Sequence, residues 1–144
     1  MVYLMQDRTP PELLAVDSYQ VEYGTSVNLF DLVTAVADRH DYQVDISDGG
    51  GGQVAEDGTS VTFSDLGSHN VVITATDSAG NSSQVTVAVA VIDDTPPTLT
   101  VTDQTVELGS DINYYNDVSA SDNFDGDLTD AVRVDSGSVD LNTI

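Results

Sequence analysis

The sequence feature that most constrains the fold is a short segment that occurs twice. Residues 7–11 read Asp-Arg-Thr-Pro-Pro and residues 93–97 read Asp-Asp-Thr-Pro-Pro, so the prolines recur after about 86 residues (Pro10 to Pro96). Proline donates no ladder hydrogen bond and holds the chain extended, which favours a stiff crossing between modules. We therefore expect tandem repeats: residues 1–6 as the last strand of a preceding repeat, residues 7–93 as a complete repeat, and residues 94–144 as a second.

The residues between the two copies have the pattern of short β-strands. Val71, Ile73 and Ala75 alternate with polar residues up to a turn at residues 77–81, and a valine-rich run, residues 85–91, alternates back. Gly80 and Asn81 suit the positive φ angles that such a hairpin needs. Other strands are expected at residues 13–16, 42–47 and 60–63, and residues 27–36 are expected to form a strand that runs into a short turn. About seven short strands with frequent turn signals and no helical periodicity predict an antiparallel β-sandwich. Residues 49–52, Gly-Gly-Gly-Gly, are expected to be a flexible hairpin tip.

Charge and composition exclude several classes of partner. Hydrophobic residues make up 40% of the 144, enough for a packed core, and the formal net charge is -22. Carboxylates cannot neutralise nucleic acid or an anionic membrane, so neither is expected as a partner. There is no cysteine, and no apolar run approaches the length that crosses a bilayer, so we expect no membrane insertion. Residues 1–6 do not have the form of a secretion signal, so a secreted parent would have to be longer than this chain.

Two stretches resemble a known family. Residues 67–81, followed by the valine-rich strand and Asp-Asp-Thr-Pro-Pro, are similar to the closing half of bacterial immunoglobulin-like repeats. Such repeats are strung in tandem on surface proteins, adhesins and secreted polysaccharide enzymes, and include the HYR-like group. Residues 122–129 resemble the Asp-Asn-x-Asp-Gly-Asp segment of the same family, and His69 stands where the family usually has an aromatic residue. The resemblance implies an all-β, antiparallel immunoglobulin-like β-sandwich in tandem repeats, in a cell-surface or secreted protein.

The second repeat is expected to be incomplete. When residues 61–66 are aligned with residues 139–144, the counterpart of residues 67–92, the final hairpin, is missing. One interpretation is that the chain is a fragment of a longer array. The other is strand donation, in which a neighbouring chain supplies the missing strands and a fibre grows. The spare strand at residues 2–5 could replace the last strand of the hairpin but not the one before it.

Two groups of acidic residues are candidate calcium sites. The first is a nine-residue stretch bent by Gly126, with four carboxylates and one amide, namely Asp122, Asn123, Asp125, Asp127 and Asp130. Hard oxygen ligands of this kind suit Ca²⁺, although the spacing is not that of an EF-hand. The second is the junction between repeats, where Asp93 and Asp94 follow the last strand and Asp77 lies in the preceding turn. By resemblance to cadherin-like arrays, calcium at such a junction would stiffen the rod.

The alternative is that these aspartates bind no metal and are solvated turn residues, because aspartate side chains accept hydrogen bonds from their own backbone in turns. The corresponding turn of the first repeat offers Asp38, Asp41 and Asp45, with Arg39 and His40 between them, so a weaker site or none is expected there.

The sequence favours a non-catalytic function. His40 and His69 are the only histidines, lysine and cysteine are absent, and the acidic residues cluster in turns instead of flanking a cleft. We expect a stalk or spacer whose partners are neighbouring repeats of the same protein. The competing class is a module that binds a glycan or a protein through the loops at one end of the sandwich, and such a module should show exposed tyrosines gathered on one surface. A third class is the strand-donated fibre subunit.

Overall fold

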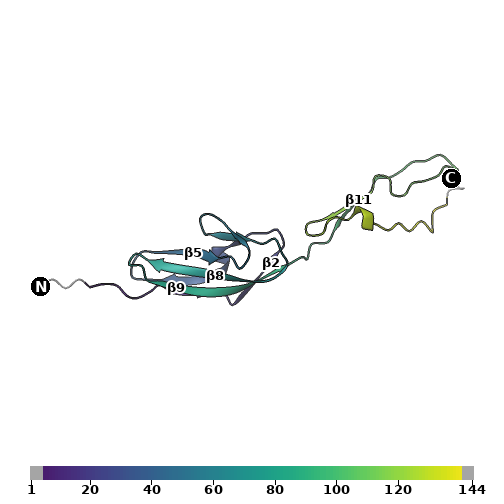
Figure 1. Ribbon diagram of the computed structural model, residues 1–144. Coiled ribbons are helices and arrows are strands. Elements are labelled where there is room, and N and C mark those ends of the chain that lie inside the picture. Colours follow the sequence, from purple (N-terminus) through teal and green to yellow (C-terminus); the bar gives the residue numbers. More distant parts are fainter. Residues whose placement is uncertain (1–4, 141–144) are drawn as a thin grey trace. The chain divides into compact units, whose positions relative to one another are not determined.

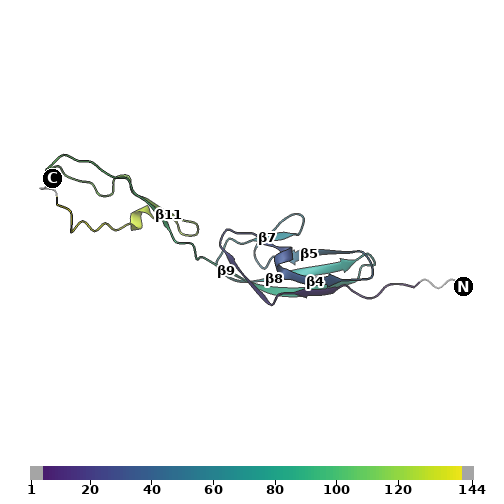
Figure 2. The ribbon, with the colours of Figure 1, turned by 180° about the vertical axis from the view of Figure 1, so that it is seen from behind.

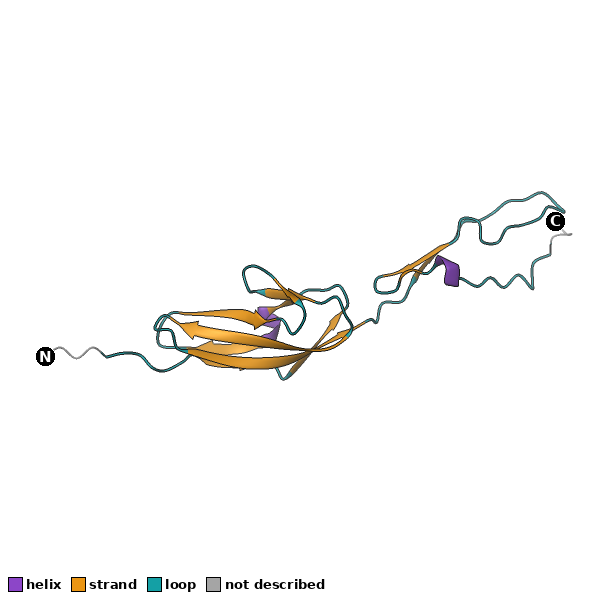
Figure 3. Ribbon diagram, viewed as in Figure 1, coloured by secondary structure: helices purple, strands orange, loops and turns teal. Residues whose placement is uncertain are grey.

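The chain folds into two compact units, Met1–Asp93 and Asp94–Ile144, which we call unit 1 and unit 2. The structure, a computed structural model, describes residues 5–140 (Figure 1). Figure 3 shows that strands make up nearly all of its regular structure. The strand expected at residues 2–5 lies outside the described residues except for Met5, which belongs to no strand.

The larger layer of unit 1 is a four-stranded sheet in the order β2-β9-β8-β5. Its strands are β2 (Ser18–Glu22), β5 (Tyr42–Asp48), β8 (Gly67–Asp77) and β9 (Ser82–Ile92). The long hairpin predicted from the alternating valines is formed by β8 and β9, which pair antiparallel over ten register positions. Strand β2 pairs with β9 in parallel. These are the first and last of the four strands along the chain, and they lie side by side in the sheet.

The second layer contains shorter strands and one turn of helix (Figure 2). It consists of the pair β1 (Glu12–Ala15) and β4 (Val33–Ala37) and the three-stranded sheet of β3 (Val27–Asn28), β7 (Ser60–Thr62) and β6 (Gln53–Val54). All pairs in this layer are antiparallel.

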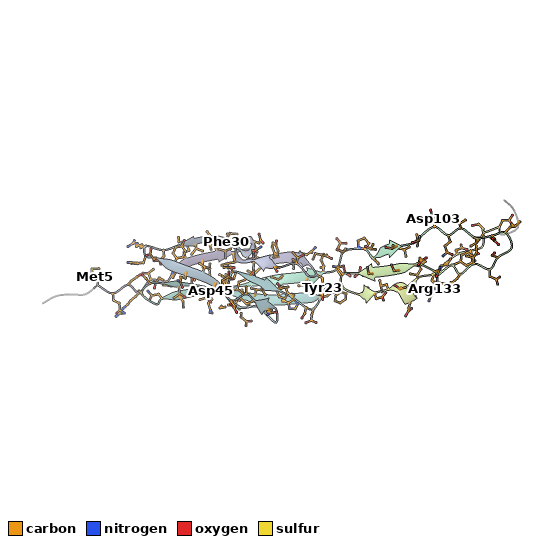
Figure 4. All side chains as sticks on the ribbon, turned by 90° about the horizontal axis from the view of Figure 1, so that it is seen from above. Met5, Tyr23, Phe30, Asp45, Asp103 and Arg133 are labelled. Atoms are coloured by element: carbon orange, nitrogen blue, oxygen red, sulfur yellow. The ribbon has the colours of Figure 1, made fainter. Side chains whose placement is uncertain are left out.

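Residues 27–36, expected to be a strand that runs into a short turn, form two strands, β3 and β4, separated by helix α1 (Leu29–Leu32). A carboxylate oxygen of Asp31 accepts a hydrogen bond from the backbone N–H of Asn28 at 3.4 Å, which favours a helical start at this point. Leu29 and Leu32, three residues apart, both lie in the core. Phe30, on the opposite side of the turn, is 83% exposed and projects away from the sandwich (Figure 4). The α-helical turn therefore buries two leucines where a strand would have alternated them.

The core of unit 1 lies between the two layers. The alternation along β8 and β9 is confirmed, since their inward-facing residues are buried while their neighbours are partly exposed. Buried apolar side chains come from both layers: Leu13, Val21, Val27, Leu29, Leu32, Ile46, Val61, Phe63, Val71, Ile73, Ala75, Val87, Val89 and Val91. The predicted class, an antiparallel immunoglobulin-like β-sandwich, is thus confirmed in unit 1, although β2 and β9 pair in parallel.

The glycines at residues 49–52 are not the flexible tip that we expected. A Cβ atom on Gly50 would lie 2.4 Å from the carbonyl oxygen of Asn70 in β8, and one on Gly52 would lie 2.6 Å from the Val61 side chain. Gly49 itself is buried. Glycine is required here because the turn packs directly against β7 and β8.

Unit 2 repeats the first strand pairing of unit 1. Strand β10 (Thr98–Thr100) pairs antiparallel with β11 (Ser119–Asp122), as β1 does with β4, and β11 also pairs with β12 (Gly126–Asp127). A 3-10 turn, η1 (Thr129–Ala131), follows. Leu99, which corresponds to buried Leu13, is 59% exposed. Within residues 94–140, as described, there is no counterpart of the β8–β9 hairpin to cover it. None of the described helices is long and apolar enough to cross a membrane.

Candidate metal-binding loops

The acidic loop of unit 2 is a tight hairpin between β11 and β12. Its first carboxylate, that of Asp122, accepts hydrogen bonds from the backbone N–H groups of Phe124 at 2.8 Å and Asp125 at 3.0 Å. Gly126 has a φ of +74°, which bends the chain back into β12. Asp122 therefore shapes the turn in the way that aspartate commonly does. Its other oxygen is not part of these two bonds.

Of the remaining residues of this stretch, Asp127 accepts a hydrogen bond from the turn that follows, and Asn123 and Asp130 are exposed. One oxygen of Asp127 accepts a hydrogen bond from the Thr129 N–H at 2.9 Å. The pKa of Asp127 is lowered, first by a hydrogen bond from the Thr129 hydroxyl and then by this N–H. Asp130 lies exposed in η1, and Asn123 lies at the hairpin tip.

The structure therefore brings together only part of the predicted five-residue set. Asp122 and Asp125 each offer an oxygen within 4.8 Å of the other. Among the described residues, Asp127 and Asp130 do not join them in one such group.

Asp77 is a buried turn-forming carboxylate at the tip of the β8–β9 hairpin. It is 6% exposed, and its oxygens accept hydrogen bonds from the N–H groups of Ala79 (2.8 Å) and Asn81 (2.9 Å) and from the Asn81 side-chain amide (2.8 Å). The Asn81 amide, followed by the backbone N–H groups, lowers the pKa of Asp77 against the opposing effect of burial. The ionised carboxylate thus holds the hairpin turn in place.

Asp77 does not lie with Asp93, with which it was grouped at the predicted junction site. Asp77 precedes the start of β9, whereas Asp93 follows its end, so the two lie at opposite ends of an eleven-residue strand. Such a strand spans about 33 Å. The predicted grouping of Asp77 with Asp93 is wrong, because the turn before a strand and the segment after it lie at opposite ends of the sandwich. Asp94 is exposed and begins unit 2.

The two histidines have different surroundings. His69 in β8 stacks on Phe63 with ring centroids 4.5 Å apart, and its two nitrogens lie 3.1 Å from the carbonyl oxygens of Gly50 and Asp65. It thus joins two turns to the strand. His40 lies in the turn after β4, 50% exposed in its side chain, with Nδ1 2.8 Å from an Asp7 oxygen.

The group of Asp7, Asp38 and His40 is a second acidic cluster that the sequence analysis did not single out. Each residue offers one ligand atom, and these atoms all lie within 4.8 Å of one another. Asp7 is 31 residues before Asp38 in the chain, so no local spacing reveals the group. The available signal was the first Asp-x-Thr-Pro-Pro segment, whose aspartate precedes the prolines as Asp93 does in the second copy.

Comparison with known proteins gives a weak likeness to solved structures and no match in sequence. No family model matches the chain, and no curated protein matches it. Among solved structures, the crystal structure of human CDH23 EC21-23 is similar with a TM-score of 0.36 and 19% sequence identity. The match covers 78% of this chain and 45% of that one, so this chain spans less than half of the matched structure. A likeness of this degree does not bear on ligand, partner or activity.

Proposed function

We propose that this chain is a non-catalytic, extracellular immunoglobulin-like repeat that acts as a stalk or spacer in a surface or secreted adhesin-like protein of the bacterial tandem-repeat kind. One observation carries the proposal: the chain enters and leaves unit 1 at opposite ends of the sandwich. The Ser83 hydroxyl at the start of β9 donates to the carbonyl oxygen of Pro11 at 2.7 Å. At the other end, Glu22 of β2 is in register with Ile92, the last residue of β9.

This arrangement follows from the parallel pairing of β2 and β9. We call the end with Pro11 and the Asp77 turn the proximal end, and the end with Ile92 the distal end. A polypeptide that crosses the module advances by the length of β9, about 33 Å for eleven residues. Repeats joined through such ends each add to the length of an array. A module with both termini at one end would project from the array without lengthening it. Neighbouring repeats are accordingly the expected partners.

The contacts of the polar side chains support a structural role over a catalytic one. His69 is occupied with two backbone carbonyl oxygens, and Asp77 with the hairpin turn. The exposed tyrosines Tyr42 and Tyr115 fall in different units, so the described residues offer no tyrosine cluster that would favour glycan binding. The strand-donated fibre remains an alternative that this geometry neither requires nor uses.

We expect unit 1 to hold its ends at a fixed separation. Because the chain contains no cysteine, spin labels can be attached at single introduced sites. Labels on Glu12→Cys and Asp93→Cys, at the proximal and distal ends, should give one narrow distance distribution centred near about 33 Å, apart from the label arms. Pulsed electron paramagnetic resonance measures this distribution directly.

The matched control pairs Glu12→Cys with Ser82→Cys, both at the proximal end, and should give a much shorter distance. A broad distribution for the long pair, or similar distances for both pairs, would contradict the spacer function, because a spacer must keep its two attachment points apart.

The finer part of the proposal is that calcium stiffens the array through the acidic loop of unit 2. Ca²⁺ at Asp122 and Asp125 would neutralise carboxylates that repel one another in a chain of formal net charge -22. An ion that binds only the folded loop stabilises it by mass action, so the melting midpoint should rise with calcium and fall again with a chelator.

Substitution by asparagine locates the calcium effect. Asp122→Asn keeps one oxygen to accept the turn's hydrogen bonds but removes the charge, and should abolish most of the calcium-dependent shift. Asp103→Asn removes the same charge from a carboxylate outside the loop and should leave the shift intact. An identical shift with sodium chloride of equal ionic strength would reduce the effect to general screening and reject the site.

A further inference from the structure

We propose that Asp7, Asp38 and His40 form a binding site for a divalent transition-metal ion at the proximal end of unit 1. The site is independent of the calcium loop and joins the segment before the first Pro-Pro pair to the body of the module. Asp7 precedes the prolines, whereas Asp38 and His40 lie in the turn between β4 and β5. All three line one surface hollow of about 720 Å³.

The distances within the group match those between neighbouring ligands of one metal ion. His40 Nδ1 lies 2.8 Å from Asp7 Oδ2 and 3.6 Å from Asp38 Oδ1. Zinc bonds to imidazole nitrogen and carboxylate oxygen are about 2.1 Å long, which places adjacent ligand atoms about 3.0 Å apart in octahedral and about 3.4 Å apart in tetrahedral geometry. A small rearrangement of exposed His40 would thus place all three ligand atoms around one ion.

A buried carboxylate oxygen without a hydrogen bond points to a missing cation. Asp7 Oδ2 is buried and accepts no hydrogen bond, and His40 Nδ1 lies beside it at 2.8 Å. Buried polar atoms are almost always satisfied, and a charged oxygen without a partner is costly. A metal ion between Asp7 and His40 would remove that cost.

Local hydrogen bonds orient both carboxylates before any ion arrives. Asp7 Oδ1 accepts from the Thr9 N–H at 3.0 Å, which leaves Oδ2 outside this turn and beside His40 Nδ1. Asp38, with a side chain only 4% exposed, accepts from the His40 N–H at 2.7 Å through Oδ1, which retains a second lone pair. The ligands are therefore held by turns whose geometry does not depend on the metal.

The imidazole nitrogen decides the class of ion. Calcium takes oxygen ligands, whereas imidazole suits zinc, copper, nickel and iron. His40 is available for this role, and His69 is not, because both of its nitrogens lie against carbonyl oxygens. Glu12 lines the same hollow and adds negative charge, which the guanidinium of Arg39 partly offsets. We therefore assign the site to an ion of the zinc type.

Titration of the 144-residue chain with Zn²⁺ in the presence of excess Ca²⁺ tests the assignment. Calcium occupies sites made of carboxylates alone, so the zinc that still binds reports an imidazole-containing site. Calorimetry should show one zinc ion per chain, and NMR should show the ring signals of His40 shifting on the same curve while those of His69 stay in place.

Substitutions at two of the three residues test how much each side chain contributes to zinc affinity. His40→Gln and Asp38→Asn should each weaken zinc binding by about tenfold or more, and asparagine at position 38 keeps the oxygen that accepts from the His40 N–H. The matched control is Asp41→Asn, an exposed neighbour in the same turn, whose contact with Ser78 is made by its backbone. It should bind zinc like the parent chain.

Two outcomes would overturn the proposal. If the His40 ring signals do not move, or if both variants bind zinc as the parent does, the three residues are only an ion pair at the edge of the module. If excess calcium displaces the zinc, the metal is held by carboxylates in general. Neither outcome would affect the spacer function, which rests on the directions of β2 and β9.

Discussion

Replacing Leu32 with alanine is expected to lower the free energy of unfolding of unit 1 by about 2–5 kcal/mol, the range for leucine-to-alanine changes in rigid cores. Leu32 is fully buried, and it sits in the one helical turn of the second layer, where its carbonyl oxygen also accepts a hydrogen bond from the Val16 N–H at 2.9 Å. Small domains are typically stable by only about 5–15 kcal/mol, so the change would remove much of the total. Urea denaturation followed by circular dichroism measures it.

Phe30→Ala in the same turn is the matched control for Leu32→Ala. Phe30 is the larger side chain but is 83% exposed, so its loss should change stability by less than about 0.5 kcal/mol. If Phe30→Ala cost as much as Leu32→Ala, the helical turn would have to face the other way, with Phe30 in the core.

Replacing Gly50 with alanine is expected to cost about 2–5 kcal/mol, from two separate causes. The φ of +62° is unfavourable for any residue with a Cβ, by about 1–2 kcal/mol. In addition, the new Cβ would lie 2.4 Å from the Asn70 carbonyl oxygen and 2.8 Å from its nitrogen. These are backbone atoms of β8 at a position paired with Ala88 of β9, so they cannot yield without disturbing that pairing; overpacking of this kind adds about 1–3 kcal/mol.

Gly51→Ala separates the two causes of the Gly50 effect. Gly51 has a φ of +99° in the same turn, but the nearest atom to its added Cβ is His69 Nδ1 at an ordinary 3.8 Å. It should therefore show the backbone cost alone. Equal losses for both variants in thermal melting would mean that the turn has room at Gly50 and does not pack on β8.

The parts of the fold that sequence reasoning predicted correctly are those set by local repetition. Alternating apolar residues around a Gly-Asn turn define the β8–β9 hairpin, and ten register pairs confirm it. The same reasoning missed helix α1, because four residues are too few to show a helical period and only Leu29 and Leu32 carry the signal. The glycines at 49–52 were assigned to a flexible tip because glycine permits both mobility and close packing, and the composition does not distinguish them.

The candidate metal sites were likewise predictable only where their residues are close in sequence. The acidic hairpin of unit 2 could be predicted because its carboxylates are close in sequence, although Asp127 and Asp130 do not belong to the described group that contains Asp122 and Asp125. The contact between Asp7 and His40 was not predicted, because the two residues meet only when the segment before β1 lies beside the turn after β4. Contacts between residues far apart in sequence depend on the whole topology, which a local pattern does not contain.

The parallel pairing of β2 with β9 also has a mechanical consequence. Five consecutive residue pairs, from Ser18–Ala88 to Glu22–Ile92, join β2, which follows β1 near the start of unit 1, to β9, the last strand before the chain leaves unit 1. Tension applied to the two sides of unit 1 would slide these strands past each other and load their hydrogen bonds in shear, all at once, where an antiparallel pair pulled from one end would unzip bond by bond. Resistance to force would then be governed by the height of that rupture barrier and not by the free energy of unfolding.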